Sequence, residues 1–309
     1  MSNSKSLIKK PAPVSRYPLK KSVTSLSTKS EEVKNLPISR SSTLKSFPNV
    51  HPSLITLNTQ LGSGQSSSVF SCTVGSKAYA LKIVSKDYKK YAKTEADILR
   101  TLSDNSIVKC YKRFERSEST WLVLELVQGV DLFTYKKKKR LSVEFIRQLA
   151  KQLIKVIEKV HKAGVVYRDL KPENIMIENN GNIKVIDFGL AKVIGDDKTN
   201  TICGSAQYMA PEVLNCEFYD YSIDYWSLGA VLFECFAGKP PYDGANLKEI
   251  RENVLNGEAD FGKIHNVWAR DFIRKLLCKV PEERLGQTNS KTIQIWSHRF
   301  LLDNEDKGP

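Results

Sequence analysis

The stretch Val166–Asn174 of this 309-residue chain has the sequence VYRDLKPEN, and it decides which fold the chain adopts. Thirteen residues after Asn174 comes the triplet Asp187–Gly189 (DFG), and the triplet Ala210–Glu212 (APE) follows further along. These stretches place four polar side chains at compact spacing, namely Asp169, Lys171, Asn174 and Asp187. Two carboxylates, one amine and one amide are thereby gathered in a short part of the chain.

These four groups are the ones that phosphoryl transfer demands. A carboxylate must orient the incoming hydroxyl, cations must neutralise the developing charge, and oxygen ligands must hold Mg²⁺. Asp169, Lys171, Asn174 and Asp187 together supply such groups. The three stretches therefore indicate phosphate chemistry, although the triplet DFG alone would carry little weight.

A glycine-rich stretch with the sequence LGSGQSSSV lies earlier in the chain. Gly62 and Gly64 stand one residue apart between two expected strands, where they allow the backbone to approach a phosphate and present N–H groups to it. A Gly/Ser-rich hairpin is also a common turn, so this stretch alone is weak evidence. Its candidate nucleotide-binding residues are Leu61, Gly62, Ser63, Gly64, Gln65, Ser66, Ser67, Ser68 and Val69.

A lysine and a glutamate follow the glycine-rich stretch. Lys82 lies near the end of an apolar strand, and Glu95 lies on the next expected helix. Taken singly, each has an ordinary interpretation, since such a lysine usually faces solvent and such a glutamate usually lies on a solvated helix face. Read with the other motifs, they predict an ion pair directed at the α- and β-phosphates of a nucleotide.

Six such motifs in one order over about residues 54–300 resemble the protein kinase superfamily. The resemblance implies a two-lobed α+β fold, in which a small antiparallel β lobe with one helix precedes a larger α-helical lobe. It also implies ATP as the phosphate donor and Mg²⁺ as the cofactor. By the resemblance, Asp169 is the catalytic base, Lys171 steadies the γ-phosphate, and Asn174 and Asp187 bind the metal ions.

The resemblance also assigns the rest of a nucleotide site. Lys82 grips the α- and β-phosphates and Glu95 positions it, while Val69 lies against the adenine. Glu125 and Val127 offer backbone groups to the adenine edge. Ala80 and Met176 sandwich the ring, although apolar residues of this kind are equally good generic core.

Two features resemble those of serine/threonine kinases, and two more resemble those of one group of serine/threonine kinases. Lys171 follows the catalytic aspartate by two residues, and Ser205 is expected to hydrogen-bond both Asp169 and Lys171. Tyr167 before Arg168, and the stretch Thr201–Ser205, are similar to the group that includes cAMP-dependent, cGMP-dependent and C-type kinases. Within that group, the catalytic subunit of cAMP-dependent protein kinase fits best.

The same resemblance suggests substrate and regulatory residues. Asp131, Glu173 and Glu234 match carboxylates that bind arginines upstream of the target serine, although each alone has the ordinary interpretation of a solvated surface acid. Thr201 matches a regulatory phosphorylated threonine, with Arg168 and Lys192 as partners of the phosphate, and Thr199 is the alternative acceptor. Protein substrates, and either a regulatory subunit or an activating kinase, are the expected partners.

Several residues depart from the pattern of that group. Ser67 stands for the third glycine, Ala206 and Gln207 stand for Pro-Glu, and Tyr91 stands for a histidine. The chain also ends nine residues after Phe300, so we expect no long C-terminal tail that packs on the small lobe. An Aurora-like kinase without this tail is the alternative within the enzyme class.

The expected domain organisation follows from composition. Residues 1–52 are rich in serine and basic residues and are expected to be a disordered tail, or else a docking or regulatory arm. The kinase domain is expected over 53–301, with a small lobe at 53–126 and a large lobe at 127–301, followed by a short tail at 302–309.

The expected strands are Leu54–Leu61, Val69–Val74, Ala78–Val84, Ile107–Phe114 and Trp121–Val127. The expected helices are Lys89–Leu102, one that begins after an N-cap at Ser142, 222–237, 246–256 and 267–278.

Two structural contacts are also expected. Glu212 should form a buried ion pair with Arg284, and Asp224 should hold the catalytic loop from the start of a helix. The run Lys136–Arg140 is most simply a solvated helix end, and its alternative is a docking site for an acidic partner.

The overall composition argues against three other classes, namely nucleic-acid-binding, membrane-spanning and secreted proteins. The net charge is +14, but residues 1–50 carry ten basic and two acidic side chains, so much of the excess belongs to the tail. We found no nucleic-acid-binding motif, and no apolar stretch long enough to span a bilayer. The N-terminus lacks the apolar run of a signal peptide, so the expected location is cytoplasmic or nuclear. The six cysteines form no C-x-x-C pair and are expected to be small buried residues.

A pseudokinase is the remaining rival from a different class. It would use the same fold as a binding module, and it predicts the loss of at least one of Lys82, Asp169, Asn174 and Asp187. All four are present. The sequence therefore favours an active enzyme.

Overall fold

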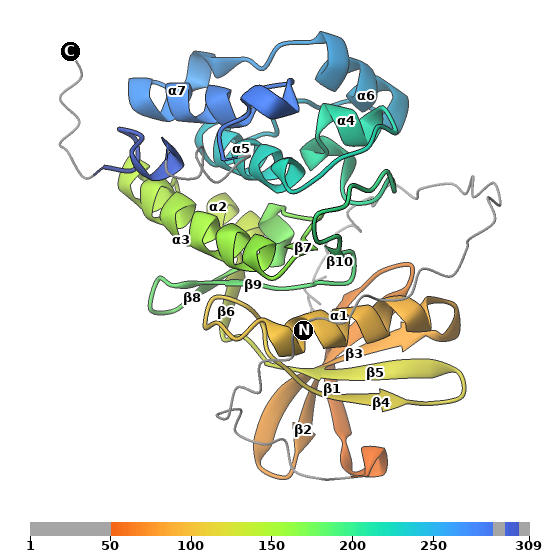
Figure 1. Ribbon diagram of the computed structural model, residues 1–309. Coiled ribbons are helices and arrows are strands. Elements are labelled where there is room, and N and C mark those ends of the chain that lie inside the picture. The colour runs from red at the N-terminus through yellow and green to blue at the C-terminus, as the bar shows by residue number, and fades with distance from the viewer. Residues whose placement is uncertain (1–50, 287–293, 303–309) are drawn as a thin grey trace, which may run out of the picture. The chain divides into compact units, whose positions relative to one another are not determined.

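The computed structural model of the chain describes residues 51–286 and 294–302. The expected N-terminal tail lies outside the described residues except for its last two positions, and the expected C-terminal tail lies outside them except for Leu302. Figure 1 shows a twisted sheet with one helix, coloured orange to yellow, and a helical part coloured green to blue. This is the two-lobed α+β fold that the sequence predicts.

The small lobe is built on one antiparallel sheet with the strand order β1-β2-β3-β5-β4. Its strands are β1 (Thr56–Ser63), β2 (Ser67–Val74), β3 (Lys77–Ser85), β4 (Cys110–Glu115) and β5 (Ser119–Leu124). The β-branched and aromatic side chains of these strands suit a pleated surface with one covered face. β3 lies at the centre of the sheet, is buried from Tyr79 to Lys82, and so carries Lys82 in its buried part.

Helix α1 (Lys89–Thr101) packs beside β3, β4 and β5 (Figure 1). Its buried positions, Ala92, Glu95, Ala96, Ile98 and Leu99, recur at helical spacing and form one face. Glu95 is the single charged residue among them, so the helix directs this carboxylate toward the sheet.

The large lobe is organised around two long helices, α3 (Val143–Lys162) and α5 (Ser222–Ala237), which pack against each other. Ser142 caps α3 as predicted, because its hydroxyl accepts the N–H of Phe145 at 3.1 Å. α5 is buried almost along its whole length, so this helix forms the centre of the lobe. The other helices are α2 (Leu132–Lys138), α4 (Pro211–Leu214), α6 (Leu247–Asn256) and α7 (Val267–Leu276).

Two small sheets flank the segments that carry Asp169 and Asp187. One has the order β6-β8-β9, with β6 (Gly129–Asp131), β8 (Ile175–Glu178) and β9 (Ile183–Val185). The other pairs β7 (Val165–Val166) with β10 (Lys192–Val193). The segment that contains Asp169 runs from β7 to β8, and the one that contains Asp187 runs from β9 to β10. Short 3₁₀ turns complete the described elements: η1 (Pro52–Leu54), η2 (Lys86–Tyr88), η3 (Pro172–Asn174), η4 (Ala206–Tyr208), η5 (Phe261–Lys263) and η6 (Pro281–Glu283).

The expected element bounds are confirmed closely for the helices and less well for the strands. The strand expected over Trp121–Val127 ends at Leu124, because the next three residues form the connection between the lobes. The strand expected from Ile107 begins at Cys110, because Ile107 instead bridges to Val185 of the large lobe. Apolar residues that cross between lobes thus extended the expected strands beyond their true ends.

The expectation that all cysteines are buried is wrong in part. Cys72 and Cys110 are buried, Cys203, Cys235 and Cys278 are half-buried, and Cys216 is exposed. Cys216 has a φ of 62° and occupies a turn after α4, where the backbone and not packing decides exposure. Separately, none of the helices in the described ranges is long and apolar enough to cross a bilayer.

Candidate active site

The predicted ion pair between Lys82 and Glu95 is confirmed. Nζ of Lys82 lies 2.8 Å from both carboxylate oxygens of Glu95, and it also lies 2.7 Å from Oδ1 of Asp187. Lys82 is 7% exposed and Glu95 is 1% exposed, so neither has the solvated position that was its simpler interpretation. Burial alone would lower the pKa of Lys82, but the two carboxylates outweigh it and raise the pKa, so the ammonium stays charged.

Gly189 makes room for this triad of Lys82, Glu95 and Asp187. A Cβ atom at position 189 would meet Oδ1 of Asp187 and Nζ of Lys82 at 3.1 Å each. The backbone N–H of Gly189 also donates to Oδ1 of Asp187 at 3.2 Å. Any side chain at this position would press on the ion pairs, which explains why the DFG triplet ends in glycine.

Asp224, at the start of α5, holds the catalytic loop as predicted. Its carboxylate accepts the backbone N–H groups of Tyr167 and Arg168 at 2.9 Å each, and it contacts Nε2 of His161 at 2.7 Å. Arg168 has a φ of 72°, a left-handed conformation that a residue with a side chain adopts at some cost. The fully buried carboxylate fixes the backbone in this conformation directly before Asp169.

Asp169 lies at the centre of a hydrogen-bond network. Its Oδ2 accepts from Nζ of Lys171 at 2.7 Å and from Nδ2 of Asn174 at 3.0 Å, and its Oδ1 accepts from the hydroxyl of Ser205 at 3.1 Å. Lys171 also donates to Ser205 at 2.8 Å, so the predicted double contact of Ser205 is present. Burial raises the pKa of Asp169, and the charge of Lys171 opposes this shift.

A second glycine allows Ser205 to reach the catalytic loop. Gly204 has a φ of 109°, and a Cβ atom there would lie 2.6 Å from the carbonyl oxygen of Arg168. Both the conformation and the close approach therefore require glycine. This contact joins the segment after DFG to the loop that carries Asp169.

Asp187 and Asn174 present oxygen atoms suited to a hard cation. Oδ1 of Asp187 is engaged by Lys82, whereas Oδ2 has no hydrogen-bond partner among the described residues. Asn174 donates its amide N–H groups to Asp169, so its amide oxygen is the atom left to bind a cation. Partial burial of Asp187 favours its neutral form, but Lys82 outweighs this and holds the pKa of Asp187 below its ordinary value.

Asp187 and Asn174 fit a Mg²⁺ site in which the phosphates of a nucleotide supply the remaining ligands. Within the described residues no group of three or more His, Cys, Asp or Glu side chains could hold a metal alone. Mg²⁺ is commonly bound through one or two carboxylates together with substrate phosphates and water. A site made by Asp187 and Asn174 has this composition.

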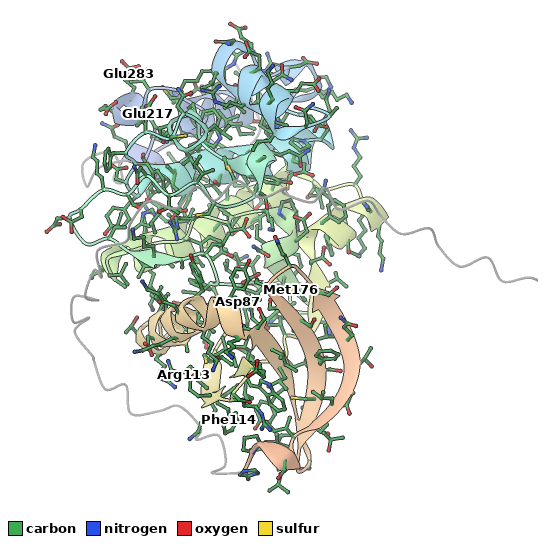
Figure 2. All side chains as sticks on the ribbon, turned by 90° about the vertical axis from the view of Figure 1, so that its right-hand side faces the viewer. Asp87, Arg113, Phe114, Met176, Glu217 and Glu283 are labelled. Carbon is green, nitrogen blue, oxygen red and sulfur yellow. The ribbon has the colours of Figure 1, made fainter. Side chains whose placement is uncertain are left out.

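The connection after β5 carries the groups predicted to contact an adenine edge. The N–H of Glu125 donates to the carbonyl of Lys109 at 2.9 Å and is therefore occupied. The carbonyl of Glu125 and the N–H of Val127 have no hydrogen-bond partner within the described residues. Ala80 lies buried on β3, and Met176 is half-buried on β8 (Figure 2), so one apolar residue comes from each lobe.

The glycine-rich stretch forms the turn between β1 and β2. The N–H of Gly64 donates to the carbonyl of Ser67 at 2.8 Å, which closes the hairpin. A Cβ atom at Gly62 would meet nothing within 4 Å, so the space beside this backbone is open. Leu61 is 54% exposed on the same strand and is therefore not part of the core.

The segment after DFG separates the two candidate threonines. Thr199 is 4% exposed, and its hydroxyl accepts from Nζ of Lys192 at 3.0 Å. Thr201 is exposed, and its hydroxyl lies 3.5 Å from that of Thr199. Arg168 donates to the carbonyl of Leu190 and to the hydroxyl of Tyr219, and no carboxylate within the described ranges pairs with it. The exposed hydroxyl of Thr201 thus lies near two cations, Arg168 and Lys192, that form no ion pair with a carboxylate of the described residues.

The three predicted substrate acids have different environments. Glu173 is exposed on η3, four residues after Asp169. Asp131 is half-buried, and its carboxylate caps α2 by accepting the N–H of Thr134 at 2.8 Å. Glu234 is 3% exposed and is hydrogen-bonded to Tyr208 and Lys136, so the interpretation of Glu234 as a solvated surface acid is wrong.

Two lysines near the site were not identified from the sequence. Lys184 on β9 is 4% exposed and donates to Oε1 of Glu125 at 2.8 Å, and Lys136 pairs with Glu234. A signal for Lys184 existed, since it interrupts the apolar run Ile183–Ile186, where a lysine needs a partner. Lys136 gave no such signal because it lies in a run of five basic residues.

The predicted pair between Glu212 and Arg284 is confirmed. Nη1 and Nη2 of Arg284 lie 2.6 and 3.0 Å from the two carboxylate oxygens of Glu212. Arg284 is fully buried and lies over the ring of Trp226 at 5.3 Å. This bidentate pair ties the APE triplet to the large lobe and contributes no catalytic group.

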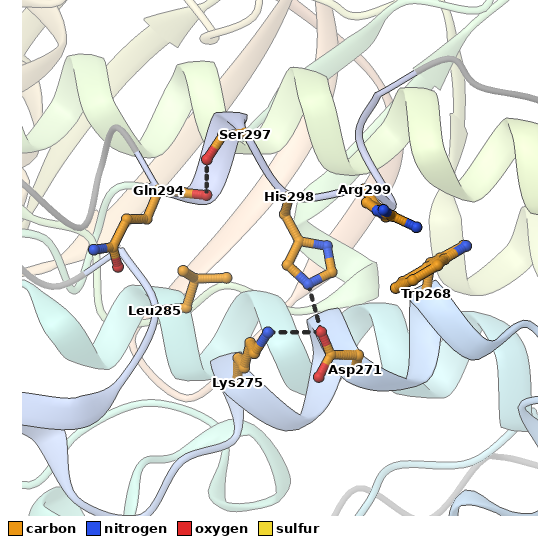
Figure 3. Close-up of a pocket in the computed structure, with 8 residues that line it drawn as sticks. All are labelled: Trp268, Asp271, Lys275, Leu285, Gln294, Ser297, His298 and Arg299. Carbon is orange, nitrogen blue, oxygen red and sulfur yellow. Dashed lines mark hydrogen bonds and ion pairs between the residues drawn. The ribbon is translucent and has the colours of Figure 1, made fainter.

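A cavity of about 360 Å³ lies elsewhere in the large lobe (Figure 3). Asp271 at its wall accepts from Lys275 at 2.7 Å and contacts Nε2 of His298 at 2.9 Å, so its polar groups satisfy one another. None of its lining residues is a predicted site residue. They are Trp268, Asp271, Lys275, Leu285, Gln294, Ser297, His298 and Arg299.

Comparison with known proteins agrees with this geometry. The family profile of the protein kinase domain matches residues 55–301. The cAMP-dependent protein kinase catalytic subunit of Dictyostelium discoideum is 34% identical over 235 residues, which cover 73% of this chain and 36% of that protein. The cAMP-dependent protein kinase type 3 of Saccharomyces cerevisiae is 33% identical over 230 residues, 72% of this chain and 58% of that protein.

A third relative is matched over more of its length. Myosin light chain kinase A of Dictyostelium discoideum is 35% identical over 242 residues, which cover 73% of this chain and 80% of that protein. By contrast, the chain spans less than two thirds of the length of the two cAMP-dependent relatives.

Proposed function

The chain belongs to the protein kinase domain family, and we propose that it transfers the γ-phosphoryl group of ATP to serine and threonine hydroxyls of protein substrates. The observation that carries this proposal is the network of Asp169, Lys171, Asn174 and Ser205. A buried carboxylate, a lysine beside it and a hydroxyl from the following segment converge on one point. Each of these groups has a separate task in phosphoryl transfer.

Asp169 orients the substrate hydroxyl and accepts its proton. The hydrogen bonds from Lys171, Asn174 and Ser205 fix both carboxylate oxygens, so the base needs no reorganisation when the hydroxyl arrives. Lys171 lies 2.7 Å from Asp169 and can stabilise negative charge that develops on the transferred group. Lys82 holds the α- and β-phosphates, and Glu95 prevents its side chain from moving away.

Mg²⁺, when bound with the nucleotide, neutralises charge on the phosphates. Asp187 and Asn174 are the residues that would hold it. The carbonyl of Glu125 and the N–H of Val127 bind the adenine edge, and Ala80 and Met176 lie against its faces. Gly62 and Gly64 let the β1–β2 turn approach the phosphates.

The substrate class follows from the acids around Asp169. Glu173 is exposed and close in sequence to the catalytic residue, so it can pair with a guanidinium of the substrate. We therefore expect a preference for arginine two or three residues before the target serine. Similarity to relatives named as cAMP-dependent kinases supports placing the chain in that group, with a regulatory subunit or an activating kinase as its partner.

The decisive test is phosphotransfer by the purified full chain. Wild type should transfer labelled phosphate from ATP to a serine peptide with upstream arginines, and Asp169→Asn should lower kcat by roughly 100-fold or more. Asp87→Asn is the matched control, because Asp87 is an exposed carboxylate that forms no hydrogen bond or ion pair with another described residue. Near-normal turnover by Asp169→Asn would refute the proposal.

A further inference from the structure

Glu234 is a carboxylate near the substrate side of the site that is already neutralised from within the chain. It lies on α5 and is 3% exposed. The hydroxyl of Tyr208 donates to its Oε2 at 2.6 Å, and Nζ of Lys136 forms an ion pair with its Oε1. Both carboxylate oxygens therefore have a donor, and one of these donors is a cation.

The elements that carry these groups converge beside Asp169. α2, which carries Lys136, packs against η3, which carries Glu173. Tyr208 lies three residues after Ser205, whose hydroxyl contacts Asp169. Although the side chain of Glu173 is exposed, partial desolvation by the surrounding protein raises its pKa. The charge of Lys171 lowers this pKa and the charges of Glu234 and Asp169 raise it, so the three carboxylates lie within electrostatic reach of one another.

Lys136 differs from the basic residues that follow it. Its side chain is 11% exposed and reaches Glu234, whereas Lys137 lies over the ring of Phe133 at 3.8 Å and Lys139 lies near the ring of Tyr135. Within the described residues, the positions from Lys137 to Arg140 form no ion pair with a carboxylate. Lys136 is thus paired with Glu234, whereas the other residues of the run, 137–140, remain at the surface.

A buried carboxylate requires a cation or several donors to stay ionised. In this chain the cation is supplied by Lys136, so a substrate arginine that approached Glu234 would have to displace it. Glu173 is exposed and forms no ion pair with any residue in the described part of the chain. The two carboxylates are therefore unequal in their capacity to bind a cation from outside.

We propose that Lys136 is a specificity-determining residue, which occupies Glu234 in place of a substrate cation and leaves Glu173 as the carboxylate that recognises one. This inference rests on the proposed kinase function. It predicts a modest preference of the wild type for an upstream arginine, because one carboxylate provides it. It also predicts that the preference for an upstream arginine becomes stronger when Lys136 is removed.

The test compares two serine peptides that differ only in arginine or norleucine two residues before the serine. The measured quantity is the ratio of their kcat/KM values with the full chain. Lys136→Met frees Glu234 and should raise this ratio by about tenfold, as expected for a close pair of opposite charges. Lys136→Arg keeps the ion pair and should leave the ratio at the wild-type value.

Two further variants control for charge and for folding. Lys137→Met removes a neighbouring cation that has no carboxylate partner, and it should not change the ratio. Lys136→Met with Glu234→Gln replaces the pair by neutral groups of similar shape, a change that buried pairs usually tolerate. The double variant should return to the wild-type ratio, because neither the wild type nor the double variant has an unpaired carboxylate at position 234.

The outcomes separate this inference from the proposed function. An unchanged ratio in Lys136→Met with an active wild type would overturn the inference alone. A fall of the ratio in the double variant would also overturn it, because Glu234 would then be binding the substrate arginine in the wild type. Absence of phosphotransfer by the wild type would overturn the kinase function, and the inference with it.

Discussion

Nζ of Lys184 lies 2.8 Å from Oε1 of Glu125, so an ion pair joins β9 of the large lobe to the connection that follows β5 of the small lobe. The lysine is 4% exposed, whereas the glutamate side chain is 22% exposed. The other oxygen of Glu125 accepts the N–H of Lys109 at 3.2 Å. The connection proposed to bind adenine is therefore held on both sides.

Lys184→Met should destabilise the chain by about 3 kcal/mol, because it leaves a partly buried carboxylate without its cation. It should also raise KM for ATP, since Glu125 begins the connection proposed to bind adenine. Urea unfolding and initial rates measure the two effects. Lys86→Met is the control, because the pair of Lys86 with Glu118 is exposed and is worth about 0–1 kcal/mol. Equal stability losses in the two variants would contradict this prediction.

Arg284→Met should cost about 4 kcal/mol of unfolding free energy. The substitution leaves Glu212 buried without its bidentate partner, and it also removes the hydrogen bond to the carbonyl of Cys278. Adding Glu212→Gln should recover a substantial part of the loss. If the single and double variants unfold at the same urea concentration, the ion pair does not carry the stability.

Thr201 should carry a phosphate in the active enzyme, and Thr201→Ala should lower activity several-fold. Thr201 is exposed, and a phosphate there could reach Arg168 and Lys192, which have no carboxylate partners among the described residues. Thr199 should carry none, because it is 4% exposed and its hydroxyl is bound by Lys192. Peptide mass mapping of active protein distinguishes the two sites, and phosphate on Thr199 alone would reverse the assignment.

The acid limb of the pH profile should lie above the pKa of an ordinary aspartic acid. The proposed base Asp169 can accept a proton only when it is ionised, and burial raises its pKa, so activity should fall as pH decreases through that raised value. Lys171 favours the ionised form, so Lys171→Met should move the acid limb to higher pH as well as lower kcat. The pH dependence of kcat/KM measures this, with Lys86→Met expected to leave the limb in place. A limb that moves to lower pH would contradict the assignment of Asp169 as the base.

The sequence predicted those contacts whose residues belong to motifs of the family that the chain resembles, whether near or far apart in the chain. Ser205 and Asp169 lie 36 residues apart and Glu212 and Arg284 lie 72 residues apart, and both contacts were predicted. The pairs of Lys184 with Glu125 and of Lys136 with Glu234 span 59 and 98 residues. No local spacing connects such residues, because the packing of separate elements brings them together. For the same reason the sequence did not reveal that Glu234, predicted to bind a substrate arginine, is buried against Lys136 and Tyr208.

Asp224 has a consequence for the timescale on which the catalytic loop can open. The amide protons of Tyr167 and Arg168 both point to this buried carboxylate, although neither amide belongs to a helix. A proton held in this way exchanges with solvent only when the structure around it opens. Because Asp224 lies in the buried core helix α5, both amides should exchange with deuterium as slowly as the interior of that helix. The segment that presents the catalytic base would then persist as long as the large lobe itself.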